Sequence, residues 1–504
     1  RHNCEVYVDP KLGPYHLVMT RVDVRRGGFS LYLFYRMQVI YEKNRDVYVL
    51  FTRWGRIGED GTYQQTPFAS KEECIKEFHK IFKQKAGNEW ENKANFQKVP
   101  RKYQLHKLEA KKENVKDYFL PYDLNNALIP RSELPEEVQN IMKTITSVKM
   151  YQKAFERLDI DREAFPLANI SRDLVLEAKG VLGDIKELIE ERDKIEEDKD
   201  YKDKPQAILR LAEQIADKSS RFYELIPVPH ALNEPIRPID GISDLAKKTT
   251  MIDQLIDYET AIKIILGSMK NLFVVNPLDY CFKALNIHAV PLAQDNPEYS
   301  IIQHYFNTDS FSRQLLNVFA VERRGEAERF APYKHDNNRL LLWHGTKLSN
   351  FMGILYHGLR IAPPEAPATG YNFGKGIYFA DMPQKSYSYT NDYAISGEQD
   401  NFRMMLLCEV ALGEMKKVYQ PEYVEKLEAP YNSVMGIGST TPNPKQSIVL
   451  ANGAKVPCGR EINLQQLEYK KKYEDRIHYH LSYNEYIVYK VEQVRIRYVV
   501  QLRQ

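Results

Sequence analysis

The sequence predicts a multidomain α+β protein built from three blocks, and three changes of pattern along the chain support this prediction. Residues 1–100 read mainly as strands with one helix, and residues 133–270 have helical periodicity. From about residue 271, glycines, prolines and aromatic residues rise and alternating strands return. The length of 504 residues agrees with roughly three domains, each able to bury its own core.

The composition excludes several broad classes of protein. Apolar residues make up 43% and charged residues 28%, which is typical of globular proteins. The net charge of +3 is too small to indicate a nucleic-acid partner, so any basic surface must be local. The apolar run at 30–41 contains Arg36 and is too short to cross a bilayer. We recognise no signal peptide, and because the chain begins at Arg1, we expect that modules could precede it.

The cysteines predict neither a disulfide framework nor a metal site. There are five, at positions 4, 74, 281, 408 and 458, and no C-x-x-C pair occurs. An odd number of widely spaced cysteines indicates a reducing compartment.

The first block combines strands, one helix and a basic segment. The run VYVLFTRWGRIG at 47–58 predicts a strand that ends in a glycine-rich turn. Ser70 is placed as a helix N-cap with Glu73 as its capping-box partner. One helical stripe follows, formed by Cys74, Ile75, Phe78, Ile81 and Phe82. From 83 to 116, ten Lys or Arg face four Asp or Glu, which fits either a solvated linker or a nucleic-acid contact.

The second block reads as an all-helical bundle. One apolar face is formed by Val138, Ile141, Met142, Ile145 and Val148. After Ser171 as a predicted cap, another is formed by Leu174, Ala178, Val181, Leu182, Ile185, Leu188 and Ile189. Further helices are predicted at 205–225 and 243–266, with a helix end and an exposed loop between 189 and 204. Nothing in this block indicates catalysis.

The third block holds the residues that could carry chemistry. The strand RLLLWHGT ends in His344-Gly345-Thr346, where a lone histidine is more often a core residue than a ligand. On a single strand over 480–491, Glu485 shares one face with Tyr483, Ile487 and Tyr489. A carboxylate among such neighbours is expensive to bury, so it is expected to be paired or functional. The alternating residues 494–502 predict a half-buried strand.

The loop GYNFGKGIYFAD at 370–381 matches neither the dinucleotide fingerprint nor the P-loop. Its glycines would let the backbone approach a ligand closely. Its aromatic residues could stack on a planar ring, although an aromatic core near a turn is the alternative: Tyr371, Phe373, Tyr378 and Phe379, followed by Tyr387 and Tyr389.

One buried carboxylate, a histidine and stacking tyrosines fit cleavage of a glycosidic bond. A negative charge near the sugar stabilises the positive charge that develops as the bond breaks. An ordinary glycosidase needs a second carboxylate as general acid. One is enough if the leaving group needs no proton, as with nicotinamide in NAD+.

Three motifs, RLLLWHGT, GLRIAPPEAPATGYNFGKGIYFAD and SYNEYIVY, closely resemble the catalytic domain of the poly(ADP-ribose) polymerases, in particular their DNA-damage-responsive branch. TRWGRIG with GNEW resembles the WGR domain of that branch, and SRFYELIP lies in a block that resembles its regulatory helical domain. The resemblance implies four segments: a β-rich WGR domain with a basic C-terminal segment (1–118), a linker (119–132), a regulatory helical domain (133–270) and a mixed, mainly antiparallel ADP-ribosyltransferase domain (271–504).

By the same resemblance, the histidine, tyrosine and glutamate of the family fall on His344, Tyr378 and Glu485. The histidine would bind the adenosine ribose and the tyrosine would stack on nicotinamide. The glutamate would bind the nicotinamide ribose, polarise the reacting centre and activate the acceptor hydroxyl. Lys385 would line the acceptor side.

Other contacts to NAD+ are implied in the same way. The Gly345 backbone and the Ser386 hydroxyl would hold the carboxamide, and Tyr389 would stack on the second face of the ring. Asn350 and Arg360 would lie on the adenosine side, and the remaining predicted NAD+ contacts are Thr346 and Tyr371. No metal is expected.

The resemblance also implies partners and regulation. Trp54 and Arg56 would contact DNA at strand breaks or ends, although a tryptophan after a strand is more often a core residue. The helical domain would inhibit the enzyme until DNA binds. The acceptors of ADP-ribose would be proteins, including the enzyme itself. The location would be nuclear, with no membrane partner.

The alternatives are a mono-ADP-ribosyltransferase and an inactive DNA-binding scaffold. The complete His–Tyr–Glu set argues against the scaffold, and His344 excludes toxin-like transferases that use arginine there.

Overall fold

The computed structural model describes residues 4–25, 31–57, 59–105, 123–160, 171–228, 236–307, 311, 313–361, 372–390, 402–468 and 477–503. They divide into two compact units. The first comprises Arg1–Phe119, Phe155–Glu259 and Glu365–Pro367, and the second comprises Leu120–Ala154, Thr260–Pro364 and Ala368–Gln504. The bounds of the four predicted segments stay predictions.

The first unit begins with a six-stranded antiparallel sheet in the order β7-β6-β5-β4-β8, with β1 beside the end of β5. The predicted strand at 47–58 is β6, so this prediction is confirmed. The strands are β1 (Cys4–Val6), β4 (His16–Asp23), β5 (Leu31–Glu42), β6 (Val47–Arg56), β7 (Thr62–Phe68) and β8 (Gln104–Leu105); β2 (Val8–Asp9) and β3 (Gly13–Pro14) form a separate hairpin.

Helix α1 (Lys71–Ala86) covers this sheet and confirms the predicted cap and stripe. The Ser70 hydroxyl accepts a hydrogen bond from the backbone N–H of Glu73 at 3.2 Å. The helix ends at Gly87, whose φ of +70° is the left-handed conformation that glycine adopts without strain. Cys74, Phe78 and Phe82 are fully buried in the core, and Ile75 and Ile81 pack at its margin.

The helical block contains α3 (Glu136–Ile145), α4 (Val148–Glu156), α5 (Arg172–Glu197), α6 (Lys204–Leu225) and α7 (Ile242–Lys270). α5, α6 and the first part of α7 belong to the first unit, whereas α3, most of α4 and the last part of α7 belong to the second. The predicted apolar face from Val138 to Val148 is buried, but it does not belong to one helix. The chain leaves α3 at Thr146, and Val148 begins α4. The sequence pattern predicted one continuous face because both helices bury their apolar residues, so the helical spacing of apolar positions continues across the break.

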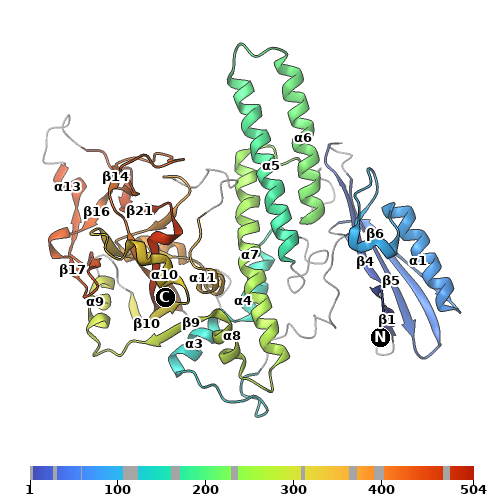
Figure 1. Ribbon diagram of the computed structural model, residues 1–504, viewed down its shortest axis with the longest axis horizontal. Helices are drawn as coiled ribbons and strands as arrows, with labels where there is room; N and C mark the ends of the chain where they lie inside the picture. The colour runs from blue at the N-terminus through green and yellow to red at the C-terminus, as the bar shows by residue number, and fades with distance from the viewer. Residues whose placement is uncertain are drawn as a thin grey trace. The chain divides into compact units, whose positions relative to one another are not determined.

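Helices α5 and α6 lie side by side in the first unit (Figure 1). Ser171 occupies the N-cap position of α5 as predicted, but its side chain makes no capping hydrogen bond. α5 ends at Glu197, and α6 begins at Lys204 after an exposed turn, as the mixed-charge run predicts.

The second unit is centred on a seven-stranded sheet in the order β17-β18-β11-β13-β22-β10-β9, in which only the β11–β18 pair is parallel. The expected mixed, mainly antiparallel arrangement is confirmed. Its strands are β9 (Ile287–Pro291), β10 (Gln314–Arg323), β11 (Arg339–Gly345), β13 (Phe402–Ala411), β17 (Ile448–Val449), β18 (Lys455–Val456) and β22 (Val494–Arg503). The helices that follow the helical block in this unit are α8 (Pro277–Leu285), α9 (Pro297–Phe306), α10 (Glu326–Phe330), α11 (Phe351–His357), α12 (Pro383–Tyr387) and α13 (Leu464–Glu468).

Strand β22 is more buried than its alternation predicts. Val494, Ile496 and Tyr498 are buried on one face, as expected, but Val499 and Gln501 on the other face are buried too. β22 pairs with β13 at one edge and with β10 at the other, and in its second half the side chains on both faces of the strand are buried.

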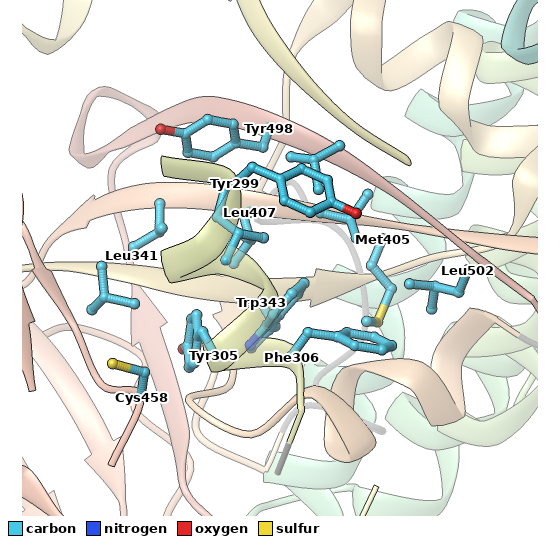
Figure 2. Close-up of a cluster of buried hydrophobic side chains, with 14 of the residues drawn as sticks. Tyr299, Tyr305, Phe306, Leu341, Trp343, Met405, Leu407, Cys458, Tyr498 and Leu502 are labelled. Atoms are coloured by element: carbon cyan, nitrogen blue, oxygen red, sulfur yellow. The ribbon is translucent and has the colours of Figure 1, made fainter. Parts of the chain in front are cut away.

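The core under this sheet fixes the end of β11. Figure 2 shows Trp343 of β11 among Tyr305 and Phe306 of α9, with Met405 and Leu407 of β13 nearby. The Trp343 side chain is fully buried, and its ring lies 5.1 Å from that of Tyr305 between centroids. This packing anchors the residue immediately before His344.

Two smaller sheets complete the unit: one of four strands in the order β12-β21-β15-β14, and one of three in the order β19-β16-β20. Trp343 and Ala380 exchange two backbone hydrogen bonds, of 2.8 and 3.0 Å, and so join β11 to the end of β12. The strands are β12 (Ile377–Phe379), β14 (Met415–Val418), β15 (Ser433–Gly436), β16 (Gly438–Pro442), β19 (Glu461–Asn463), β20 (Leu481–Tyr483) and β21 (Glu485–Val488).

The single strand predicted across 480–491 is two strands. β20 ends at Tyr483 and pairs with β16, whereas β21 begins at Glu485 and pairs with β12 and β15. Asn484 lies between them, so Tyr483 and Glu485 belong to different sheets.

In the described part of the chain, no helix combines the length and apolar character needed to cross a membrane.

Candidate active site

A cavity of 280 Å³ opens in the second unit where β11, β12, β21 and α12 meet. Its walls come from four stretches of sequence that the fold brings together. The lining residues are His344, Gly345, Asn372, Tyr378, Phe379, Ala380, Lys385, Ser386, Tyr389 and Glu485. Seven of them are among the residues predicted from sequence to contact NAD+ or to act in catalysis.

Gly345 ends β11 against the backbone of α12. A Cβ atom at this position would lie 1.7 Å from the carbonyl oxygen of Ser386, which no side chain can tolerate. The glycine is therefore required by a close approach of two protein segments. That approach brings the histidine strand and the Lys385–Ser386 turn to the same wall of the cavity.

His344 is held in one orientation by a backbone acceptor. Its Nδ1 lies 2.9 Å from the carbonyl oxygen of Tyr378 and must donate to it, because a carbonyl only accepts. Burial lowers the pKa of His344, although this hydrogen bond opposes the shift. The neutral ring therefore carries its proton on Nδ1 and leaves Nε2 as an acceptor.

Tyr378 is fixed at both ends. Its carbonyl accepts from His344, and its hydroxyl donates to the Gly374 carbonyl at 2.7 Å and accepts from the Phe373 N–H at 3.1 Å. Because the hydroxyl is tied to the preceding loop, the ring has a defined position in the cavity wall.

Glu485 begins β21 and is 5% exposed. Its Oε1 lies 2.6 Å from Nζ of Lys385, so the carboxylate is paired, one of the two outcomes expected for a buried carboxylate. Burial alone would lower the pKa of Lys385, but the hydrogen bond and charge of Glu485 raise it above its ordinary value. Lys385 is therefore a cation at neutral pH, and it also lies 5.4 Å from the centroid of the Tyr389 ring.

Ser386 and Tyr389 complete the wall formed by α12 and the turn after it. The buried Ser386 hydroxyl donates to the Trp343 carbonyl at 3.0 Å, which leaves its oxygen able to accept a further hydrogen bond. Tyr389 is 55% exposed and stands at the cavity mouth.

The predicted adenosine-side residues lie beyond the cavity. The Asn350 side chain donates to the Thr346 hydroxyl at 3.0 Å, and the buried Oδ1 of Asn350 has no hydrogen bond among the residues that the structure describes. Arg360 is exposed at the end of the segment after α11. Tyr371 lies outside the described residues.

The glycines of the 370–381 loop serve the protein's own packing. A Cβ at Gly374 would lie 1.9 Å from the Val424 carbonyl oxygen, and one at Gly376 would lie 2.3 Å from Ile487. Phe373 and Phe379 are buried, so only Tyr378 offers a partly open ring in the described part of this loop. The space that a side chain would need at these two positions is filled by the protein itself. The expectation that the loop also approaches a ligand closely stays a prediction.

Sequence reasoning missed the polar residues that support β21. Asp381 follows the Tyr-Phe-Ala stretch directly and is 1% exposed, and Asn484 and Tyr486 flank Glu485. The signal was available, since an aspartate and an asparagine stand inside the two motifs. Their contacts, however, link residues more than a hundred positions apart.

The predicted DNA residues lie on β6 in the first unit. Trp54 is partly buried, stacks on Tyr35 with ring centroids 5.9 Å apart, and packs against the sheet core. Arg56 ends the strand opposite Leu33. The basic segment 83–116 is described only up to Leu105. Nothing in these contacts tests DNA binding.

Across the described ranges, no three or more His, Cys, Asp or Glu side chains are grouped so that they could hold a metal ion.

Three family models match consecutive parts of the chain. The "WGR domain" matches residues 15–97, the "Poly(ADP-ribose) polymerase, regulatory domain" matches 132–282, and the "Poly(ADP-ribose) polymerase catalytic domain" matches 296–504.

Curated relatives match over nearly the whole chain. A "Poly [ADP-ribose] polymerase" from Sarcophaga peregrina is 33% identical over 99% of this chain, and one from Drosophila melanogaster is 34% identical over 99%. The chain spans 46% of the length of each, a little under half. "Poly [ADP-ribose] polymerase 2" from Arabidopsis thaliana is 31% identical over 97% of this chain, which covers 73% of that relative.

Proposed function

The chain belongs to the poly(ADP-ribose) polymerase family, and from this we propose that it cleaves the bond between ribose and nicotinamide in NAD+, transfers ADP-ribose to proteins, including itself, and extends ADP-ribose chains. The observation that carries the proposal is the position of Glu485, a buried carboxylate in a cavity shared with His344 and Tyr378.

The role of Glu485 follows from the charge of the transition state. As nicotinamide leaves, positive charge develops on the ribose ring, and a fixed carboxylate stabilises that charge more than the ground state. Lys385 holds one oxygen of Glu485 at 2.6 Å and so fixes the direction of the group. The other oxygen would accept from a ribose or acceptor hydroxyl. Nicotinamide leaves as a neutral base, so this chemistry needs no second carboxylate as general acid.

The hydrogen-bonding groups of the cavity fit the two ends of such a substrate. A neutral His344 with its proton on Nδ1 offers Nε2 to a ribose hydroxyl, which is a donor. The Ser386 hydroxyl already donates a hydrogen bond to the Trp343 carbonyl, and its oxygen can accept one from a carboxamide NH₂. Tyr378 and Tyr389 offer rings to the nicotinamide plane.

DNA at strand breaks is the proposed activator, and Trp54 and Arg56 are the proposed contacts. The proposal is supported by the way the sheet and α6 meet within the first unit. The Tyr32 hydroxyl donates to the Val228 carbonyl at 2.6 Å, and Lys98 pairs with the buried Glu224 at 2.9 Å. DNA that alters the sheet could therefore act on the helical block, provided that it binds the active state better than the inhibited one. A nuclear location follows from this role.

The deciding experiment measures transfer of label from NAD+ to protein, with and without broken duplex DNA. The variants are Glu485→Gln and a control, Glu422→Gln, whose carboxylate pairs with Lys416 on the surface of the same unit. High-mass products that require DNA, persist in the control and are lost or reduced to single additions in Glu485→Gln are expected.

Two other outcomes would replace the proposal. Single additions from the unmutated protein would assign a mono-ADP-ribosyltransferase, and no transfer with DNA still bound would assign a scaffold. Autoinhibition has its own test: deletion of residues 133–270 should raise activity without DNA, and unchanged activity would refute it.

A further inference from the structure

A buried carboxylate outside the cavity lies directly behind Glu485. Asp381 follows Ala380 at the end of β12 and is 1% exposed. Its Oδ2 accepts a hydrogen bond from the Asn484 side-chain amide at 2.7 Å and another from the Tyr486 hydroxyl at 2.9 Å. One carboxylate oxygen thus joins the residue before Glu485 to the residue after it.

Because side chains alternate between the two faces of a strand, these hydrogen bonds also affect the direction of the Glu485 side chain. Glu485 and Tyr486 are successive residues of β21 and project to opposite faces. Asn484 lies on the side of Tyr486, because both side chains reach Oδ2 of Asp381. Holding both neighbours on the Asp381 face turns the Glu485 side chain toward the cavity.

Asn484 extends the attachment to a second strand. Its Oδ1 accepts from the Gly438 N–H at 2.9 Å, and its amide also donates to the Thr441 hydroxyl at 2.9 Å. The turn between β20 and β21 is therefore held by side-chain bonds as well as by strand pairing, at the point where a one-residue shift would reverse the direction of Glu485.

Stability alone does not explain a carboxylate here. In the described part of the chain Asp381 has no ion pair, and its Oδ1 has no hydrogen-bond partner. Burial raises the pKa of Asp381 to about 6, against the opposing hydrogen bonds from Asn484 and Tyr486. Keeping this charge at neutral pH costs folding free energy, and such groups concentrate where function needs them.

We propose that Asp381 is a positioning residue which, through Asn484 and Tyr486, fixes the direction in which Glu485 enters the cavity. The inference rests on the proposed function, since Glu485 must act on NAD+ for its direction to matter. Asp381 does not line the cavity, so it acts on the reaction only through its two partners.

The test compares two tyrosines whose hydroxyl groups each donate a hydrogen bond to a carboxylate. Tyr486 donates to Asp381, and Tyr498 donates to Glu298 at 2.6 Å in the same unit but away from the cavity. Tyr486→Phe and Tyr498→Phe each remove one such hydrogen bond and keep the ring. Nicotinamide release would be followed for both, together with the thermal unfolding midpoint.

Tyr486→Phe is expected to lower kcat about tenfold with KM for NAD+ within about twofold, because a misdirected carboxylate affects the transition state more than binding. Tyr498→Phe is expected to keep kcat while losing a similar amount of thermal stability. Equal kcat values for the two variants would overturn the proposal.

A double-mutant cycle separates positioning from a direct effect of charge. Asp381→Asn keeps an acceptor oxygen for both partners but removes the charge, so its hydrogen bonds weaken. If Asp381 acts through Tyr486, the loss of kcat in Asp381→Asn with Tyr486→Phe will be smaller than the product of the single losses. Independent, multiplying losses would overturn the route through Tyr486. No nicotinamide release from the unmutated protein would instead refute the proposed function itself.

Discussion

At the scale of single residues, the cavity depends on groups whose positions are set by their neighbours. His344 presents Nε2 as an acceptor because its Nδ1–H donates a hydrogen bond to the Tyr378 carbonyl. Glu485 has a fixed direction because Lys385 and the segment around Asn484 hold it. The chemistry therefore depends on contacts within the protein that hold these side chains in place, including contacts of Asn484, which does not line the cavity.

Gly345 offers a direct test of this dependence. In Gly345→Ala, the new methyl group would overlap the Ser386 carbonyl, so β11 and α12 must move apart. We expect a loss of about 1–3 kcal/mol in unfolding free energy, as for other overpacked sites, and a fall in kcat of more than about tenfold. Chemical denaturation and nicotinamide release measure the two effects.

Gly180→Ala is the matched control. Gly180 lies inside α5, and apart from its chain neighbours and the nearby backbone of the helix itself, no atom lies within 4 Å of the position that a Cβ would occupy there. Alanine should therefore stabilise the helix by up to ~1 kcal/mol and leave catalysis unchanged. A Gly345→Ala protein as stable and active as this control would show that the close approach to Ser386 has no consequence.

Asp381 predicts a pH dependence of stability. Its pKa is raised from 3.8 to about 6 in the folded protein, so the folded state binds this proton more tightly than the unfolded chain. Its contribution to stability is therefore fully present below pH 3.8 and is lost as pH rises through 6, a change of roughly 3 kcal/mol.

Asp381→Asn cannot ionise and should escape this loss. Its unfolding free energy relative to the unmutated protein should increase between pH 4 and pH 6 and then stay constant, as measured by urea denaturation at a series of pH values. A difference that does not vary with pH would mean that Asp381 titrates alike in both states.

At the scale of elements, local sequence signals predicted the presence of helices and strands better than the residues at which they begin and end. Ser70 and the apolar stripe correctly gave α1, whereas the pattern from Val138 to Val148 concealed a break between two helices. The motif SYNEYIVY read as one strand but divides at Asn484 between two sheets. Such breaks depend on contacts with residues far away in the sequence, and the periodicity of apolar residues carries no information about those contacts.

The two serine caps give a prediction at this scale. Ser70→Ala removes the hydrogen bond to the Glu73 N–H and should cost about 1 kcal/mol in local stability of α1. Ser171→Ala at the start of α5 should cost much less, because that side chain makes no capping bond. Hydrogen exchange of the first-turn amides measures both, and equal changes would contradict the assignment of Ser70 as the functional cap.

At the scale of the whole molecule, the proposed activation depends on contacts between the sheet and the helical block of the first unit. The Tyr32 hydroxyl both donates to and accepts from the backbone of Val228, and both residues are buried. These bonds are a route by which DNA bound to the sheet could alter the helices.

Tyr32→Phe removes these bonds and keeps the ring. We expect DNA-stimulated activity to fall about fivefold, which corresponds to a loss of ~1 kcal/mol of coupling, while activity without DNA and DNA affinity stay unchanged. The ratio of activities with and without DNA measures the coupling, and fluorescence anisotropy measures DNA binding. Tyr41→Phe on the same strand, where the hydroxyl donates to Asp46, is the control and should keep the ratio. If both variants behave alike, the Tyr32 contact does not transmit activation.

The sequence alone determined the family, the α+β class and the seven predicted residues that line the cavity, because long motifs record which side chains a reaction needs. It could not predict that Gly374 and Gly376 serve internal packing, that β22 is buried on both faces, or that Asp381 holds both neighbours of Glu485. These facts depend on which strands become neighbours. Asp381 and Tyr486 are 105 positions apart, and only the pairing of β12 with β21 brings them within hydrogen-bond distance.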